Sequence, residues 1–189
     1  MEIQKWLFNR LRVYPSKNVV GQNFSLFIIV TLENQGTQTE TFDVTVYCNS
    51  TFIGSETVAL TSGSFKNVTF TWNTSGFAKG NYTISAYAQP VSGETDTADN
   101  RYEDGTVIVS IPCDIAGSTT TPPAPPDGAV NYKDVFWFLK AYGSDPSKPN
   151  WNPNCDVAGS TTTPPAPPDN LVNYKDIFWL LKYYGKTDP

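Results

Sequence analysis

Histidine is absent from this chain of 189 residues, and its absence excludes several kinds of active site. A Ser-His-Asp or Cys-His catalytic site needs a histidine, and so does histidine-ligated zinc. The three cysteines have no Cys-x-x-Cys spacing, and no glycine-rich phosphate loop occurs. The sequence therefore predicts that the protein is not an enzyme.

Charged residues are scarce, at 16% of the chain, and the net charge is −5. A nucleic-acid-binding protein would show a basic face, so this class is excluded. No apolar run reaches the roughly 18 residues that a transmembrane helix needs, so no transmembrane segment is expected. The first residues lack the long apolar stretch and cleavage site of a signal peptide, so the start of the chain does not settle the compartment.

Proline is rare in the first part of the chain and common in the rest. Of the 15 prolines, all but Pro15 and Pro90 lie at or after Pro112. We therefore predict an N-terminal arm at 1–10, a first domain at 11–111 and a second domain at 112–189. The second domain is near the size at which a metal or a disulfide is usually needed for stability.

The second domain contains an internal repeat. The segment Cys113–Asp127 returns 42 residues later as Cys155–Asp169, with a single Ile-to-Val change. The match continues into two short aromatic segments that end at Gly143 and Gly185, so the repeats span 113–143 and 155–185. Carboxylates that recur at fixed spacing before a helix are typical of a metal-binding loop.

The first domain has short, alternating or β-branched runs separated by turn residues, which predicts an all-β sandwich. In one run, Phe42, Val44 and Val46 share a face while Asp43 and Thr45 point the other way. Seven strands are expected, at Leu11–Pro15, Asn23–Leu32, Thr39–Cys48, Thr51–Leu60, Ser64–Trp72, Gly80–Ala88 and Gly105–Ile111.

Several motifs of this domain occur in an order that resembles the CARDB family, in an archaeal version. These motifs are Val20–Gln22, Asn34–Gly36, Thr69–Thr74, Gly80–Ile84 and Gly93–Asn100. CARDB domains are immunoglobulin-like, cell-adhesion-related domains of prokaryotic surface proteins. The resemblance covers roughly residues 10–111, and it implies a seven-stranded sandwich that spaces or adheres without catalysis.

The N-terminal arm lies outside that resemblance and carries three consecutive large apolar residues, Trp6, Leu7 and Phe8. Its periodicity fits a helix face and a strand face equally well. Two interpretations stay open. The arm is either an extended first strand of the same sandwich or a strand that adds to a neighbouring subunit.

The repeats of the second domain predict two interrupted calcium loops. A helix–loop calcium site places oxygen ligands at loop positions 1, 3, 5, 7, 9 and 12, with position 7 using its carbonyl. When Ser118–Pro126 is left out, the first repeat fits this spacing, and the second repeat follows it. The expected ligands are Asp114, Asp127, the Ala129 carbonyl, Asn131 and Asp134, then Asp156, Asp169, the Leu171 carbonyl, Asn173 and Asp176. The alternative is that these residues are ordinary turn residues that bind no ion.

Each loop is followed by one expected helix, at Tyr132–Tyr142 and Tyr174–Tyr184, with a glycine after it as the C-terminal stop. A calcium loop with one exit helix, present twice, resembles the dockerin module over residues 113–187. The resemblance implies two calcium ions and a cohesin-like receptor, chosen in part by Tyr132-Lys133 and Tyr174-Lys175. Two departures weaken the sites: position 3 is Ala116 or Ala158, and a Thr-Pro insert interrupts each loop.

Sequence motifs for glycosylation indicate an extracellular or cell-surface location. Five Asn-x-Ser/Thr sequons occur, at Asn23, Asn49, Asn67, Asn73 and Asn81. The Thr-Pro inserts have the composition of O-glycosylated stalks or of solvated loops, and the candidate sites are Thr119, Thr120, Thr121, Thr161, Thr162 and Thr163.

Cys113 and Cys155 occupy equivalent positions before the two loops, and a disulfide between them would stabilise the module by roughly 4 kcal/mol. Cys48 would then be left over, on a strand and buried. The helices are rich in aromatic residues, and Trp137 and Trp179 are candidates for contact with a neighbouring molecule or a sugar.

Together these features predict a secreted, glycosylated, calcium-stabilised structural or adhesive protein that assembles with copies of itself into a filament or surface layer. A docking adaptor for a cohesin-like receptor and a carbohydrate-binding module are the two alternatives.

Overall fold

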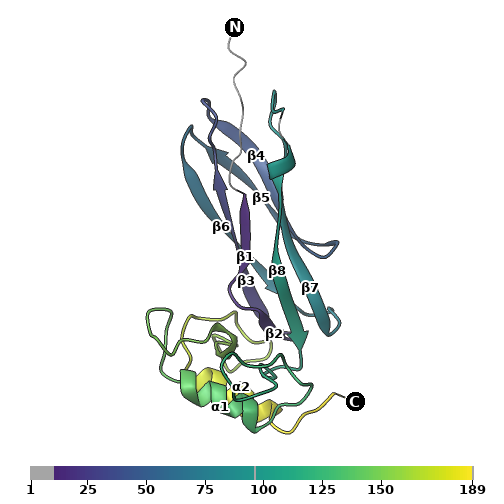
Figure 1. Ribbon diagram of the computed structural model, residues 1–189, viewed down its shortest axis with the longest axis vertical. Helices are drawn as coiled ribbons and strands as arrows, with labels where there is room; N and C mark the ends of the chain where they lie inside the picture. Colours follow the sequence, from purple (N-terminus) through teal and green to yellow (C-terminus); the bar gives the residue numbers. More distant parts are fainter. Residues whose placement is uncertain (1–10, 96, 189) are drawn as a thin grey trace. The chain divides into compact units, whose positions relative to one another are not determined.

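The computed structural model describes residues 11–95 and 97–188. They form a mainly β structure with two α-helices, shown in Figure 1. The predicted contact residues Trp6, Leu7 and Phe8 of the N-terminal arm lie outside the described residues.

The described residues contain eight strands, two α-helices and two short 3-10 helices. The strands are β1 (Arg12–Pro15), β2 (Val19–Gly21), β3 (Ser25–Glu33), β4 (Glu40–Cys48), β5 (Thr51–Leu60), β6 (Phe65–Asn73), β7 (Gly80–Ala88) and β8 (Arg101–Ser110). The helices are η1 (Ala98–Asn100), α1 (Tyr132–Ala141), η2 (Pro153–Cys155) and α2 (Tyr174–Tyr183).

The strands form two sheets, with the orders β1-β3-β6 and β2-β8-β7-β4-β5. The pairs β1–β3, β4–β5 and β4–β7 are antiparallel, whereas β2 runs parallel to β8 with Val20 opposite Val109. Two facing sheets of mainly antiparallel strands are consistent with the expected immunoglobulin-like sandwich.

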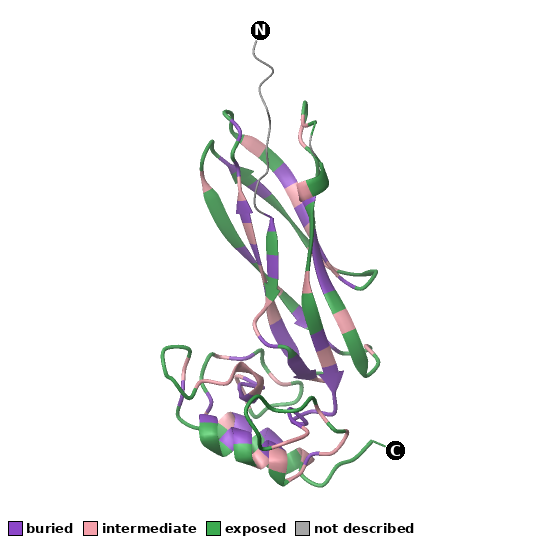
Figure 2. Cartoon of the chain, viewed as in Figure 1, coloured by how far each residue is buried: buried purple, intermediate pink, exposed green. Residues whose placement is uncertain are grey.

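The hydrophobic alternation of the strands matches their burial. In β4, Phe42, Val44, Val46 and Cys48 are buried while the residues between them are partly exposed. The same alternation runs along β3 and is visible as purple bands in Figure 2. One face of β3 and one face of β4 therefore supply core residues, as the period of two requires.

Two strand predictions are wrong. The described residues contain eight strands rather than seven, because the three-residue strand β2, which pairs with β8, is too short to show a period of two in the sequence. The last strand begins at Arg101 rather than Gly105, because strand pairing continues through a glycine whose φ is 57°. In the sequence, the turn-forming residues before Gly105 indicate a strand boundary, but pairing within the sheet overrides this local preference.

Contacts divide the chain into two compact units. The first comprises Met1–Pro15, Ile28–Phe70 and Tyr82–Thr106, and the second comprises Ser16–Phe27, Thr71–Asn81 and Val107–Pro189. The second unit thus combines the C-terminal repeats with two segments that the sequence analysis assigned to the sandwich. The domain boundary at Ile111–Pro112 stays a prediction.

The helices of the repeats begin where expected and end one residue earlier. Tyr142 and Tyr184 are the C-terminal caps, and Gly143 and Gly185 follow with φ values of 75° and 79°. A left-handed residue after the last helical turn favours glycine because it has no Cβ. Neither described α-helix has the length and apolar character to cross a membrane.

Candidate functional site

Each helix of the repeats starts with a capping box made by two of the predicted calcium ligands. The side chain of Asn131 accepts a hydrogen bond from Lys133 N at 2.9 Å, and Asp134 Oδ2 accepts one from Asn131 N at 2.8 Å. Asn173 and Asp176 repeat this arrangement at α2. These side chains satisfy the free N–H groups of a helix start.

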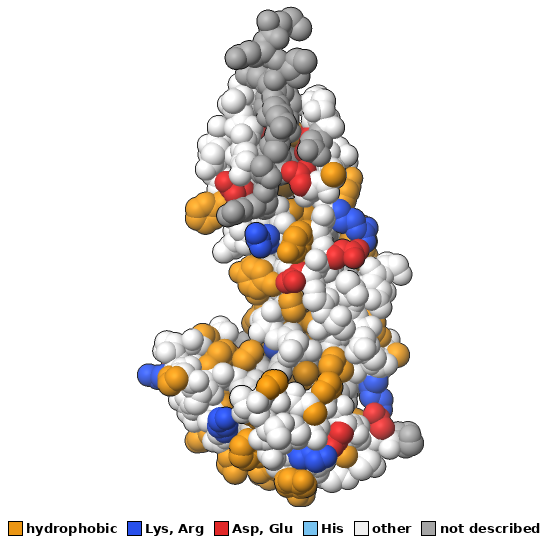
Figure 3. Space-filling view, in the orientation of Figure 1, with side chains coloured by type: hydrophobic (Ala, Val, Ile, Leu, Met, Phe, Trp, Pro, Cys, Tyr) orange, Lys and Arg blue, Asp and Glu red, His pale blue; other side chains and the backbone are white. Residues whose placement is uncertain are grey.

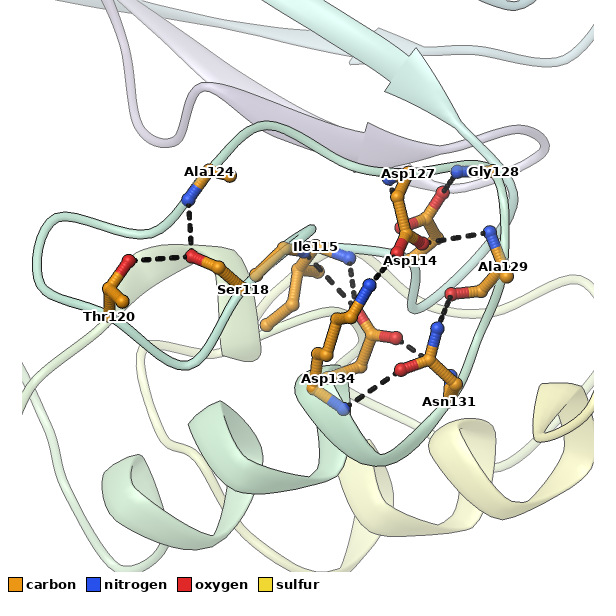
Figure 4. A network of polar contacts seen from close by, with 12 residues as sticks. Asp114, Ile115, Ser118, Thr120, Ala124, Asp127, Gly128, Ala129, Asn131 and Asp134 are labelled. Carbon is orange, nitrogen blue, oxygen red and sulfur yellow. Dashed lines mark hydrogen bonds and ion pairs between the residues drawn. The ribbon is translucent and has the colours of Figure 1, made fainter.

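Asp134 also holds the beginning of its loop. Its Oδ1 accepts hydrogen bonds from Ile115 N at 2.8 Å and Ala116 N at 3.1 Å. Asp176 binds Val157 N and Ala158 N in the same way. One buried carboxylate therefore joins the helix start to the loop start in each repeat, as Figure 4 shows for the first.

Asp114 closes the loop from its other side. Its Oδ1 accepts from Asp127 N at 3.3 Å and its Oδ2 from Gly128 N at 2.9 Å. Asp156 makes the equivalent bonds to Asp169 N and Asn170 N. Gly128 and Asn170 have φ values of 81° and 63°, so the loop turns through a left-handed residue in both repeats.

The remaining carboxylate of each loop is paired with a lysine. Asp127 Oδ2 accepts from Lys133 Nζ, and Asp169 Oδ2 accepts from Lys175 Nζ at 2.5 Å. The hydrogen bonds to Asp127 and Asp169 raise the pKa of these two lysines. The lysines come directly after the first residue of each helix, so a cation of the chain itself lies against each loop.

The buried carboxylates have raised pKa values. Burial raises the pKa of Asp114 to about 7, and the charge of Asp134 acts in the same direction. Burial raises the pKa of Asp156 to about 6, while the charge of Lys17 opposes this shift. The pKa of Asp134 is also raised, mainly by burial, although its three backbone hydrogen bonds favour the ionised form.

The arrangement of these residues leaves the calcium prediction unconfirmed. Calcium takes six to eight oxygen ligands, and Ala116 and Ala158 offer no side-chain oxygen at position 3. Asp127 and Asp169 are turned to lysines, and the other carboxylates accept backbone N–H groups. Across residues 11–95 and 97–188, no group of three or more His, Cys, Asp or Glu is arranged to hold a metal ion. The carboxylate spacing predicted a loop, but it did not show that Lys133 and Lys175 pair with one carboxylate of each loop.

A buried lysine that the sequence analysis missed lies next to the second repeat. Lys17 is 5% exposed, and its Nζ donates to the carbonyl oxygen of Asp156. Burial lowers the pKa of Lys17 to about 8, against the opposing charges of Asp156 and Asp176. Asn154 lies nearby and accepts hydrogen bonds from Asn18 N and Val19 N. Their sequence positions, more than 130 residues apart, gave no signal of this contact.

The two repeats are joined by reciprocal backbone hydrogen bonds. Gly143 N, after α1, donates to Val172 O of the second loop at 2.8 Å. Gly185 N, after α2, donates to Val130 O of the first loop at the same distance. Val172 N and Val130 N complete the pairs by donating to Ser144 O and Lys186 O. The segment after each helix therefore provides hydrogen-bond partners for the backbone N–H and carbonyl of the valine in the loop of the other repeat.

Trp137 and Trp179 are core residues rather than an exposed platform, and their predicted contact with a neighbouring molecule or a sugar stays a prediction. They are 7% and 2% exposed. The indole Nε1 of each donates at 2.7 Å to the carbonyl of Ser118 or Ser160, at the start of the Thr-Pro insert. Each tryptophan thus holds its insert against the helix.

The Thr-Pro inserts are compact loops with exposed threonines. Ser118 Oγ accepts from Ala124 N at 2.9 Å, and Ser160 repeats this with Ala166 N. The predicted O-glycosylation sites Thr119–Thr121 and Thr161–Thr163 are exposed, and so are all five sequon asparagines of the first domain. Glycosylation at these positions stays a prediction.

The predicted disulfide between Cys113 and Cys155 is not formed in the structure. All three cysteines are free and buried. Burial raises the pKa of Cys48 to about 12 and raises the pKa of Cys113 and Cys155 as well, so their thiols are protonated. An ionised Cys155 would raise the pKa of Cys113 further, which agrees with their equivalent positions in the repeats.

The exposed apolar residues of the helices are the feature that the sequence analysis did not single out. Tyr132, Phe136 and Leu139 on α1 correspond to Tyr174, Phe178 and Leu181 on α2, and all six are 40% to 70% exposed. Their spacing of four and three residues places each set on one helix face. We call these sets the α1 stripe and the α2 stripe. Figure 3 shows apolar side chains on the surface over this part of the chain.

Comparisons with known proteins match the first part of the chain. The CARDB family model matches residues 9–104, so residues 105–189 lie outside it. Among curated proteins no relative was matched.

Similar solved structures include three archaeal domains. A CARDB domain from Pyrococcus furiosus, crystallised in complex with di-metal ions, is 28% identical with a TM-score of 0.46, and the match covers 55% of this chain and 96% of that one. A solution structure of a CARDB domain from the same organism is 27% identical, with a TM-score of 0.43 and coverage of 54% and 92%. A domain of a candidate cell-surface protein from Methanosarcina acetivorans is 24% identical, with a TM-score of 0.44 and coverage of 57% and 93%.

Proposed function

We propose, from the premise that this chain belongs to the CARDB family, that it is a structural or adhesive protein of the cell surface that binds other proteins through its C-terminal repeats. CARDB domains are non-enzymatic surface domains, and the family match covers the sandwich strands up to the start of β8. The repeats outside the match supply the binding function.

The observation that carries this proposal is the pair of equivalent apolar stripes. A monomeric soluble protein rarely exposes contiguous apolar patches without a binding role. In each repeat the neighbouring Trp137 or Trp179 is buried, whereas Phe136 and Phe178 remain 40% exposed in both copies. Two equivalent stripes on one chain offer two contacts of the same kind, which favours assembly with further copies of this chain into a filament or layer.

A docking adaptor is the second candidate, favoured by Tyr132 and Tyr174. These residues occupy the loop positions that help to choose the receptor in dockerins, and both are exposed. The following lysines, Lys133 and Lys175, are engaged with Asp127 and Asp169 and are less available to a receptor. In this alternative, the two stripes bind a cohesin-like receptor in two equivalent orientations.

One set of variants tests both candidates. We expect the purified protein to form assemblies that grow with concentration in multi-angle light scattering and appear as ordered arrays in electron microscopy. Leu139→Asp combined with Leu181→Asp should abolish them, because a charge in a buried apolar contact is costly. Lys140→Asp with Lys182→Asp is the matched control for the change of charge. Monodisperse monomers at all concentrations would contradict self-assembly, and capture of a cohesin domain by those monomers would favour the adaptor.

The extracellular location and glycosylation form a separate part of the proposal. It is supported by the exposure of all five sequon asparagines and of the threonines in both inserts. Intact mass spectrometry of protein from an archaeal host should show masses above that of the polypeptide. A single peak at the polypeptide mass would remove glycosylation from the proposal.

Calcium does not enter the proposal as a part of the folded module. In each loop that the sequence analysis assigned to a calcium ion, one carboxylate is paired with a lysine and the others accept backbone N–H groups. We therefore propose that the module folds without calcium.

A further inference from the structure

A hollow of about 500 Å³ lies within the second compact unit. Its lining comes from the residues before β3, the end of β6 with the turn after it, the second Thr-Pro insert and the end of α2. This volume is within the usual range of pockets that bind small molecules. Neither apolar stripe contributes to it, so the hollow is separate from the proposed docking surface.

Three aromatic rings form the base of the hollow. Phe24 meets Trp179 edge to face, with ring centroids 5.1 Å apart, and meets Tyr183 at 6.2 Å. The rings of Trp179 and Tyr183 are stacked at an interplanar angle of 30°. Phe24 and Trp179 are buried, whereas Tyr183 is partly exposed and offers ring surface to a ligand. Contacts between the rings hold this surface in place.

Neutral hydrogen-bonding groups surround the aromatic base. Asn23, Asn73 and Ser75 are exposed and contribute amides and a hydroxyl. Lys182 Nζ lies 4.3 Å from the centre of the Trp179 ring and 3.5 Å from Thr163 Oγ1, so its charge is directed to the aromatic face and the insert. No carboxylate is among the described residues that line the hollow. This chemistry suits an uncharged, hydroxyl-rich ligand better than a cation.

The hollow exists where the two repeats differ. Tyr183 of the second repeat corresponds to Ala141 of the first, which is 1% exposed. Trp137 and Lys140 keep the cation–π contact of the second repeat, with Nζ 4.7 Å from the ring centre. The tryptophan–lysine pair is therefore common to both repeats, and the tyrosine that extends it into a binding surface is not.

We propose that this hollow is a saccharide-binding site. The apolar face of a sugar ring would pack on Tyr183, and its hydroxyls would bond to the amides of Asn23 and Asn73 and the hydroxyl of Ser75. The inference goes beyond the proposed function, and either can fail without the other.

Two sources of the saccharide share this chemistry. Asn23 and Asn73 are themselves the first residues of sequons, so an N-linked glycan of the chain could fold into the hollow. The amide oxygen of Asn73 accepts from Ser75 N at 2.8 Å, which fixes this side chain at the rim. The other source is a glycan of the surrounding surface that binds from solution.

The first experiment uses the full chain made without glycosylation in a bacterial host. Glucose, mannose and N-acetylglucosamine are titrated separately while the resonances of Trp179 and Tyr183 are followed by NMR. We expect saturable shifts with a dissociation constant in the millimolar range for at least one sugar. Tyr183→Ala should weaken binding by about tenfold because the stacking surface is lost. The adjacent exposed residue gives the matched control Tyr184→Ala, which should bind normally.

A second pair of variants keeps the test valid if Tyr183→Ala does not fold. Lys182→Met should change binding, whereas Lys140→Met, its counterpart in the first repeat, should not. The absence of saturable binding with all three sugars overturns the proposal. Equal losses in the Lys182 and Lys140 variants, or in the Tyr183 and Tyr184 variants, overturn it as well, because the effect would not be local.

The second experiment separates the sources of the saccharide. Free sugar is titrated into glycosylated protein and into its Asn23→Gln and Asn73→Gln variants, with Asn49→Gln as the control sequon. If an attached glycan fills the hollow, free sugar should bind only after Asn23 or Asn73 is replaced. If free sugar binds the glycosylated protein unchanged, the ligand comes from solution and the site stands. Glycosylated and unglycosylated protein that both fail to bind free sugar would overturn the site.

Discussion

At the scale of single residues, the carboxylate of Asp134 combines two roles in the first repeat. It accepts one hydrogen bond at the helix start and two at the loop start, and it is fully buried. Asp176 is its counterpart in the second repeat. A group with this many backbone partners is costly to remove because the donors are left buried and unpaired.

We expect Asp134→Ala to lower the free energy of unfolding by about 3 kcal/mol, since three N–H groups, two of them buried, lose their acceptor. Urea denaturation followed by tryptophan fluorescence measures this change. Asp145→Ala is the control, because the side chain of Asp145 accepts hydrogen bonds from Ser147 in the linker between the repeats. If Asp134→Ala lost no more stability than the control, the proposed role of Asp134 in joining the helix start to the loop start would be contradicted.

The raised pKa of Asp114 predicts how the stability of the folded protein depends on pH. Its folded-state pKa of about 7 lies above the value of about 3.9 for an unfolded chain, so the folded protein takes up the proton first. This contribution to stability is complete below the unfolded pKa and is lost as the pH rises through the folded one. We expect the melting temperature to fall between about pH 5 and about pH 7, with Asp156 acting in the same direction through its pKa of about 6.

Asp114→Asn should flatten this part of the pH profile, which differential scanning calorimetry can follow. Asp145→Asn is the control. Hydrogen bonds from Ser147 lower the pKa of Asp145, so this substitution should not flatten the fall in melting temperature. Equal slopes for Asp114→Asn and the unmodified protein would show that another group titrates.

At the scale of elements, the Thr-Pro inserts depend on a glycine that allows close approach. A Cβ on Gly117 would lie 2.4 Å from Pro125 O, and one on Gly159 would lie 2.5 Å from Pro167 O. Gly117 N and Gly159 N also donate hydrogen bonds across the insert. The insert is thus folded back on itself at this point in both repeats.

We expect Gly117→Ala to destabilise the protein by about 2 to 3 kcal/mol, since the backbone must move to relieve the clash. Gly63→Ala is the control: its added methyl meets nothing within 4 Å, although its φ of 70° costs about 1 kcal/mol. Thermal denaturation compares the two variants. A smaller loss for Gly117→Ala than for Gly63→Ala would mean that the insert opens without cost.

Alternation and internal repetition made most elements predictable. The period of two identified β3 to β7, and the repeated Asn-Tyr-Lys-Asp segment identified both helix starts. The short strand β2 could not be found, because its three residues are defined by pairing with β8 rather than by local sequence. Carboxylate spacing alone could not distinguish a metal ligand from an acceptor of backbone N–H groups, since both uses place Asp114 and Asp134 at the same loop positions.

At the scale of the whole molecule, the source of positive charge in the repeats determines their dependence on metal. Lys133 and Lys175 each pair with one carboxylate of their own loop, and Lys17 contacts the second loop from a segment near the start of the chain. A divalent ion would compete with these ammonium groups for the same region.

If the module folds without calcium, as we propose, calcium and a chelator should change the melting temperature by less than about 1 °C, because only an ion bound to the folded state shifts it. Lys133→Gln with Lys175→Gln should introduce calcium-dependent stabilisation, because Asp127 and Asp169 are released. Calorimetry with and without millimolar calcium gives both results. A large chelator effect on the unmodified protein would restore the calcium prediction.

The reciprocal hydrogen bonds from Gly143 to Val172 and from Gly185 to Val130 have consequences for gene fusion and for proteolysis of the two repeats. If either repeat were expressed alone, the N–H of the glycine after its helix would lose its carbonyl acceptor. The valine of its loop would lose both of its backbone hydrogen bonds to the other repeat. Gene fusions that transplant the region should therefore succeed only when both halves travel together. A protease that separates the halves within 145–151 should leave them associated as a nicked pair until one of them is unfolded.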